Sequence, residues 1–307
     1  IVLGGGLTQS TNITLGSAAD GSSIELGATL GSLTARSLGA VSLSAPAIGK
    51  LSTTAGPLRG DLETLGAVKS ISVKGGGAGG TWQAASFGTI SITGGGFEGE
   101  LISTATAADL GKTAAIGKLT VSGGDFTGHL HAVGNVGTVK VSKDKSGAGG
   151  TMVDTHVAAA SFGTFSIGKD LQNSVVLGDD WQLGGTGTAA DTFGPGSIKK
   201  FSVGGQVQNS MVGAGLDPVG MVFRNGNDEI AGGTASKIGS FSVAGAAGAE
   251  NYFRAGAWPK KMKTGGASAN PLTDAPFLDL QGFWDYGSTG ADGRILLQIA
   301  GKQLPLQ

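Results

Sequence analysis

A short two-part motif recurs along this chain, and it constrains the fold more than any other feature. The first part is an apolar residue, usually a glycine, a small residue or lysine, and then alternating apolar and polar residues. It reads FGTISIT at 87–93, IGKLTVS at 116–122 and VGTVKVS at 136–142. Apolar residues that alternate with Ser, Thr or Lys are typical of a β-strand with one buried face. Each copy therefore predicts one strand.

The alternation also identifies the core positions of these strands. In each copy an anchor residue and the residue two places later point to the same side of the strand. The anchors are Ile71, Ile90, Leu119, Val139, Phe165, Phe201 and Phe241, and their partners are Val73, Ile92, Val121, Val141, Ile167, Val203 and Val243. The anchors follow one another at intervals of 19, 29, 20, 26, 36 and 40 residues. A basal repeat of ~20 residues with insertions accounts for these intervals.

The second part of the motif follows the first and has the form apolar–x–Gly/Asn–x–apolar. It predicts a second strand whose two apolar residues face the core, with the Gly or Asn between them at a small inward position. The apolar pairs are Leu58/Leu62, Phe97/Leu101, Phe126/Leu130, Leu171/Val175 and Val207/Met211. An Asn at the middle position is expected to stack its amide on neighbouring repeats. Glycine pairs between the two parts, such as Gly94–Gly95, predict tight turns.

These repeats predict an all-β fold, a parallel β-helix or β-solenoid of roughly eight coils with a ~20-residue basal repeat and terminal caps. A β-sandwich is the alternative, but it would favour short hairpin turns. We assign residues 1–29 to an N-terminal strand or cap, 30–264 to the repeats and 265–307 to a C-terminal cap. Aromatic residues gather in that last segment: Phe277, Phe283, Trp284 and Tyr286.

Composition excludes several functional classes. The chain has 59 glycines in 307 residues and no cysteine, so neither disulfides nor thiolate metal sites are expected. Its formal net charge is −1 and no basic stripe is visible, which argues against a nucleic-acid partner. No run of about 18 apolar residues occurs, so we expect no membrane-spanning segment.

Two groups of polar residues are candidate sites. Aligning the second part of the motif places Glu100 and His129 on successive strands, about 4.8 Å apart. With Glu98 and His131 they form the best candidate catalytic or metal-binding cluster, although a solvated strand face is the alternative interpretation.

The second group is a loop rich in Asn, Asp and Gly. The stretch NGNDEIAGG at 225–233 resembles one copy of a calcium-binding nonapeptide. Asn225, Asn227 and Asp228 are therefore a candidate calcium site, and calcium is the one cofactor considered. Because such sites need tandem copies, a local Asn/Gly turn remains the alternative.

The stretches IGKLTVSGGDFTGHL and FSVGGQVQNSMV resemble the glycine-rich β-helix repeats of very large secreted or surface-attached bacterial proteins. The resemblance covers residues 30–264 at the level of motifs. It implies a right-handed β-helix and an extracellular, cell-surface location, and it supplies no catalytic residue.

We therefore expect a non-catalytic, extracellular structural module of a bacterial surface protein, adhesin or self-assembling fibre. Expected partners are further copies joined end to end, or other surface proteins. The alternative is a carbohydrate-active or glycan-binding β-helix, similar to polysaccharide lyases or hydrolases, for which a glycan would be the partner.

Overall fold

A computed structural model describes residues 2–3, 10–179, 194–217, 229–245, 251–259, 262–265, 267–269, 296–299 and 302–305 of the chain. The chain divides into two compact units, Ile1–Thr151 and Met152–Gln307, which are described separately below. This division is not the boundary scheme expected from the motifs, 1–29, 30–264 and 265–307, which stays a prediction.

The first unit consists of short strands and one helical turn. Its elements are β1 (Val2–Leu3), β2 (Thr11–Ala18), β3 (Ser23–Leu26), β4 (Leu30–Ala40), β5 (Ser42–Ser44), β6 (Ile48–Thr53), β7 (Leu58–Arg59), β8 (Leu62–Glu63), β9 (Ala67–Lys74), β10 (Ala78–Ala84), β11 (Ser86–Thr93), β12 (Phe97–Ser103), α1 (Ala107–Leu110), β13 (Ile116–Ser122) and β14 (His129–Ser142). The strand pairings described in this unit are parallel. The helical turn α1 lies in the segment that connects β12 to β13.

Nine strands of the first unit are joined in a closed circuit of parallel pairings. One arc of the circuit runs β4–β6–β9–β11–β13–β14, and the other returns β14–β12–β10–β7–β4. The long strands β4 and β14 belong to both arcs because each changes its partner along its length. In its connectivity the unit is thus a closed nine-strand parallel β-barrel with additional strands.

The predicted β-solenoid of about eight coils is therefore wrong. That prediction assumed that each motif copy ends its own strand, so that separate coils stack in an open column. The alternating pattern does not show where a strand ends. In β14 the residues 129–132 and 136–142 form one continuous strand that serves both arcs, which closes the circuit.

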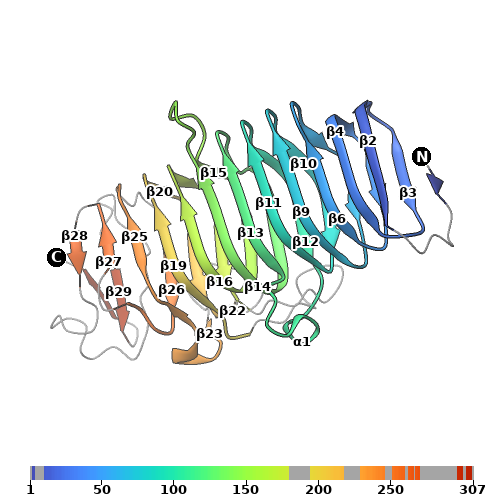
Figure 1. Cartoon of the computed structure of the whole chain (residues 1–307). Helices are drawn as coiled ribbons and strands as arrows, with labels where there is room; N and C mark the ends of the chain where they lie inside the picture. Colours follow the sequence, from blue (N-terminus) through green and yellow to red (C-terminus); the bar gives the residue numbers. More distant parts are fainter. Residues whose placement is uncertain are drawn as a thin grey trace. The chain divides into compact units, whose positions relative to one another are not determined.

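The predicted core positions of the first arc are confirmed. Ile71 pairs in register with Ile90, Ile90 with Leu119, and Leu119 with Val139. Each of these four side chains is at most 1% exposed. Their strands β9, β11 and β13 lie side by side (Figure 1). The period-2 pattern predicted this face because alternate side chains of a strand point to opposite sides.

The apolar pairs of the second motif are buried, except that Val175 is half-buried, but the middle position of several copies differs from the prediction. The middle residue is a backbone corner with positive φ at Gly60 (109°), Asn173 (48°) and Asn209 (44°). Both Asn side chains are exposed, so these two positions are not inward, whereas Gly128 is buried against the Phe97 ring as predicted. The predicted amide stacking does occur: Asn209 Nδ2 donates to Asn173 Oδ1 at 3.0 Å.

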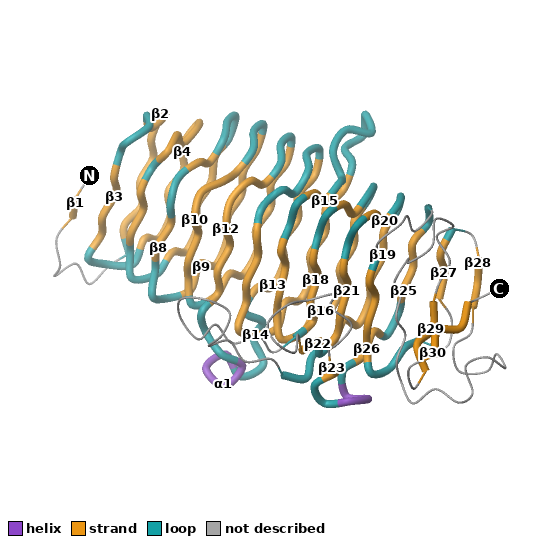
Figure 2. Tube along the Cα trace, turned by 180° about the vertical axis from the view of Figure 1, so that it is seen from behind, coloured by secondary structure: helices purple, strands orange, loops and turns teal. Residues whose placement is uncertain are grey.

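The two arcs of the first unit pack on each other through their inward side chains. On the second arc, Phe97 stacks on Phe126 with ring centroids 5.2 Å apart, and Trp82 meets Phe97 edge-on at 5.3 Å. Leu33 and Leu51 of the first arc line a small cavity together with Trp82 and other residues of the second arc. Figure 2 shows β10 and β12 of the second arc next to each other.

The second unit is built from the same two motifs. Its elements are β15 (Met152–Val153), β16 (His156–Ile167), β17 (Leu171–Gln172), β18 (Val175–Gly178), β19 (Ser197–Val203), β20 (Val207–Gln208), β21 (Met211–Ala214), β22 (Leu216–Asp217), β23 (Glu229–Ile230), the 3₁₀ turn η2 (Gly233–Ala235), β24 (Lys237–Ile238), β25 (Phe241–Val243), β26 (Tyr252–Ala255), β27 (Met262–Thr264), β28 (Ala267–Ala269), β29 (Leu296–Ile299) and β30 (Lys302–Pro305). The predicted anchors Phe165, Phe201 and Phe241 pair in register, and their rings stack with centroids 5.8 and 5.3 Å apart.

A buried polar ladder runs through the second unit. The backbone N–H of Ser174 donates to Ser210 Oγ at 3.1 Å, and the N–H of Ser210 donates to Asn251 Oδ1 at 3.1 Å. All three residues are at most 1% exposed. These side chains satisfy backbone donors at corners where no strand partner is present.

The C-terminal segment is described only in part. β27 and β28 pair antiparallel, as do β29 and β30. The aromatic residues on which the predicted cap at 265–307 depends lie outside the described residues: Phe277, Phe283, Trp284 and Tyr286.

Candidate functional site

The strands β12 and β14 bring one predicted pair of site residues together. Glu100 pairs in register with His129, so their side chains leave the same face on adjacent strands. Neighbouring strands lie ~4.8 Å apart. Both residues are exposed. The alignment of the second motif predicted this adjacency, and it is the part of the candidate cluster that the structure assembles.

The other two candidate residues do not join this pair. His131 pairs in register with Ile102 and is half-buried, in a different row of side chains from His129. Glu98 lies two residues before Glu100 on β12, a separation of ~6.8 Å along a strand. Within the part of the chain that the structure describes, no group of three or more His, Cys, Asp or Glu residues is placed to hold a metal ion.

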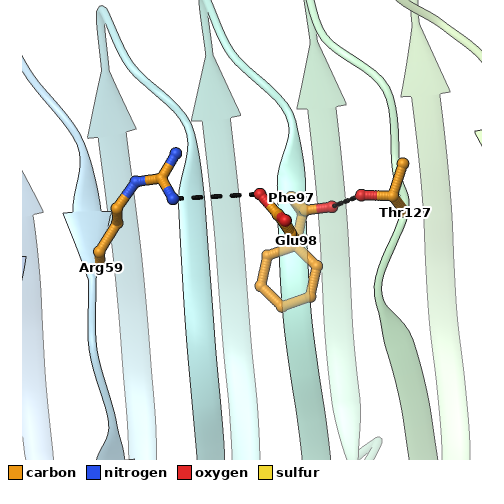
Figure 3. Close-up of polar contacts among 4 residues, drawn as sticks. All are labelled: Arg59, Phe97, Glu98 and Thr127. Carbon is orange, nitrogen blue, oxygen red and sulfur yellow. Dashed lines mark hydrogen bonds and ion pairs between the residues drawn. The ribbon is translucent and has the colours of Figure 1, made fainter.

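Glu98 instead makes an ion pair on the surface of the second arc. Its Oε2 lies 3.9 Å from a guanidinium nitrogen of Arg59 (Figure 3). Close by, the Thr127 hydroxyl and backbone N–H both donate to the carbonyl oxygen of Phe97, at 3.4 and 2.9 Å. The ion pair and the Thr127 hydrogen bonds link neighbouring strands, and Arg59, Glu98 and Thr127 are all exposed. These contacts therefore belong to the surface rather than to an enclosed site.

Three aspartates accept hydrogen bonds from the backbone of a neighbouring repeat, a structural role that the motifs did not reveal. Asp61 Oδ1 accepts the backbone N–H of Thr81 at 2.8 Å, and Asp20 Oδ1 accepts that of Ala40 at 2.7 Å. The same contact joins Asp170 to the N–H of Gln206 at 2.7 Å. In each case an Asp at a turn satisfies a donor of the following repeat. Asp61 and Asp170 stand directly before an apolar strand residue, Leu62 and Leu171, and that position is the sequence signal for this role.

The three residues of the candidate calcium site, Asn225, Asn227 and Asp228, lie outside the described residues.

The small cavity of the first unit has a volume of about 10 Å³. This volume is enough for about one water molecule. Its lining is mainly apolar, with Leu38, Val41 and Leu43 among the residues that form it. The cavity therefore has no space for a small organic ligand.

Comparisons with known proteins gave no assignment: the chain matches no family model, no curated protein and no solved structure. Among the described residues, no helix is long and apolar enough to cross a membrane.

Proposed function

We propose that this chain is a non-catalytic structural module that associates with further copies of itself, in a surface protein, adhesin or fibre outside a bacterial cell. The extracellular location is supported only by the resemblance of the motifs to secreted repeat proteins. The structural role is supported by the regular parallel pairings, which tie each repeat to the next by backbone hydrogen bonds.

The observation that carries self-association is the edge of strand β2. β2 pairs in parallel with β4, and among the described residues no strand pairs with its other edge. Ile13 and Leu15 are only half-buried, whereas their register partners Leu33 and Ala35 are 0% and 1% exposed. An unpaired strand edge beside partly exposed core residues is a template for another strand.

A strand of a second copy would complete this edge in two ways. It would pair with the backbone of β2, and its apolar residues would cover Ile13 and Leu15. Removing apolar surface from water contributes roughly 25 cal/mol per Å². Because such a contact rests on backbone pairing and apolar burial, added salt should not weaken it.

Sedimentation velocity of the whole chain over a wide concentration range tests this proposal. We expect larger species as the concentration rises, and fewer of them in an Ile13→Lys/Leu15→Lys variant, because inward charges block edge pairing. Thr14→Lys, on the exposed face of the same strand, is the matched control and should behave as the parent chain. Monomers at every concentration and salt condition would overturn the proposal.

A second function is favoured by one specific observation, the in-register pair Glu100 and His129. A carboxylate beside an imidazole can serve acid–base chemistry or bind a sugar. A screen of acidic and neutral polysaccharides, with and without Ca²⁺, tests this carbohydrate-active alternative. Turnover that is lost in both Glu100→Gln and His129→Ala would support it and would contradict the structural proposal.

A further inference from the structure

Basic side chains of the first unit gather on one arc of its strand circuit. The strands β6, β9, β13 and β14 carry five exposed lysines: Lys50, Lys69, Lys74, Lys118 and Lys140. The described strand residues of this arc, including β11 and residues 30–35 of β4, contain neither Asp nor Glu. We call these five residues the lysine face.

Acidic side chains gather on the second arc and on the strands β3, β5 and β8, which continue its pairing. β3, β8 and β12, with the turn between β7 and β8, carry five exposed carboxylates: Glu25, Asp61, Glu63, Glu98 and Glu100. The described strands β3, β5, β7, β8, β10 and β12 contain no lysine, and their one arginine, Arg59, already contacts Glu98. We call these five residues the carboxylate face.

The two faces point away from each other. The strands of the two faces pack together through their inward side chains, because Leu51 of β6 and Leu62 of β8 line the same cavity. The charged residues are on the opposite sides of those strands. One copy therefore presents a basic surface and an acidic surface on opposite sides, and neither is neutralised by the other within the molecule.

We propose that copies of this chain associate side by side, with the lysine face of one copy on the carboxylate face of the next. This proposal rests on the proposed structural function and adds a lateral contact to the contact at β2. Because both faces are built on parallel strands that lie ~4.8 Å apart, their charges are spaced by multiples of the same distance. Opposite charges can then meet in rows.

Charge balance supports a second copy as the partner. The formal net charge of the chain is −1, so little overall repulsion opposes association of identical copies. A polyanion would use the lysine face alone and leave the carboxylate face without a counterpart. In the second unit the described strands β19, β24 and β27 also carry exposed lysines and no acidic residue: Lys199, Lys200, Lys237 and Lys263.

A contact between two different faces of identical molecules is heterologous, and it can propagate. Because each pair of charges is exposed, the contact should be weak and sensitive to salt. Raising the ionic strength from about 0.01 M to about 1 M shortens the Debye length from about 30 Å to about 3 Å. We expect this change to weaken lateral association at least tenfold.

Charge-reversal variants test the proposal on the whole chain by sedimentation velocity and light scattering at low salt. Lys50→Glu/Lys69→Glu/Lys118→Glu/Lys140→Glu makes both faces acidic, and Glu25→Lys/Glu63→Lys/Glu98→Lys/Glu100→Lys makes both faces basic. Each variant alone should lose the salt-sensitive association. An equimolar mixture of the two should recover it, because every face then meets its opposite. Lys112→Glu, exposed beyond both faces in the insertion after α1, is the control and should associate as the parent chain does.

The outcomes separate this inference from the proposed function. Circular dichroism and thermal unfolding establish first that every variant is folded. Association that is insensitive to salt and to the reversals, yet lost in Ile13→Lys/Leu15→Lys, overturns the lateral contact and leaves the structural function standing. A mixture of folded variants that stays dispersed overturns the lateral contact as well. No association of the parent chain under any condition overturns both proposals.

Discussion

Arg59 and Glu98 form an ion pair across an intervening strand. Leu58 and Phe97 both pair in register with Ala78, so Gly79 lies between Arg59 and Glu98 in one row. Because Gly79 has no side chain, the guanidinium and carboxylate meet over it at 3.9 Å. Arg59 is the one basic residue on the described strands β3, β5, β7, β8, β10 and β12, to which the carboxylate face belongs.

Removing the pair should change the stability of the fold little. The side chains of Arg59 and Glu98 are 59% and 76% exposed. Exposed pairs contribute about 0.2–1 kcal/mol to folding. We expect Arg59→Ala, Glu98→Ala and the double variant to give a coupling free energy below about 1 kcal/mol in urea unfolding. A coupling of several kcal/mol would contradict the assignment as a surface pair.

Truncating the middle ring of the stacked phenylalanines should be costly. Phe201 is 0% exposed and stacks on Phe165 and Phe241. Because Phe201→Ala leaves a cavity between two rings, we expect a loss of roughly 3–5 kcal/mol in the free energy of unfolding. Leu65→Ala is the control, since Leu65 is 93% exposed, and it should change stability by less than about 0.5 kcal/mol.

Gly80 should not tolerate a side chain. Its φ is 104°, and a Cβ there would overlap the carbonyl oxygen of Gly60 on the neighbouring strand. Backbone strain of this kind costs on the order of 1–3 kcal/mol. Gly80→Ala should therefore lower the unfolding temperature clearly. Gly16 has no positive φ, and a Cβ added there would meet no atom within 4 Å, so Gly16→Ala should leave stability equal or slightly higher.

The buried polar ladder of the second unit should depend on each hydroxyl. Ser210 Oγ accepts the N–H of Ser174 and donates to the carbonyl of Gln208 at 2.7 Å. Ser210→Ala leaves the Ser174 donor buried without an acceptor, which costs about 1–3 kcal/mol. Chemical denaturation measures this loss. Ser240→Ala, at an exposed position of the second unit, is a control that should stay within about 0.5 kcal/mol.

The turn at 143–150 should be sensitive to acid. Asp144 accepts hydrogen bonds from the Ser146 hydroxyl at 2.6 Å and from the Ala148 N–H at 2.9 Å, and these lower the pKa of its carboxyl. A carboxyl with a lowered pKa in the folded state stabilises the turn above its ordinary pKa, and this contribution disappears as the pH falls through the folded value. NMR titration should show the lowered pKa, and Ser146→Ala should raise it. An unchanged pKa in that variant would contradict the assigned cause.

Part of this architecture follows from local patterns. The anchors Ile71, Ile90, Leu119 and Val139 could be predicted because alternation places them on one face, and equal motif positions on neighbouring repeats then pair. The same alignment predicted that Glu100 lies beside His129. It did not predict that Asn173 and Asn209 are left-handed corners, because this depends on backbone dihedrals rather than on residue type.

The closed circuit of strands in the first unit could not be predicted from the alternating pattern. Alternating polarity determines which side chains of a strand turn inward, since that choice is made within a few residues. Which strand pairs with which, and where β4 and β14 pass from one arc to the other, depends on hydrogen bonds between residues about 20 or more apart. Those pairings also separate the lysines from the carboxylates in space, so the repeats determined the strands and the tertiary structure decided which charges share a face.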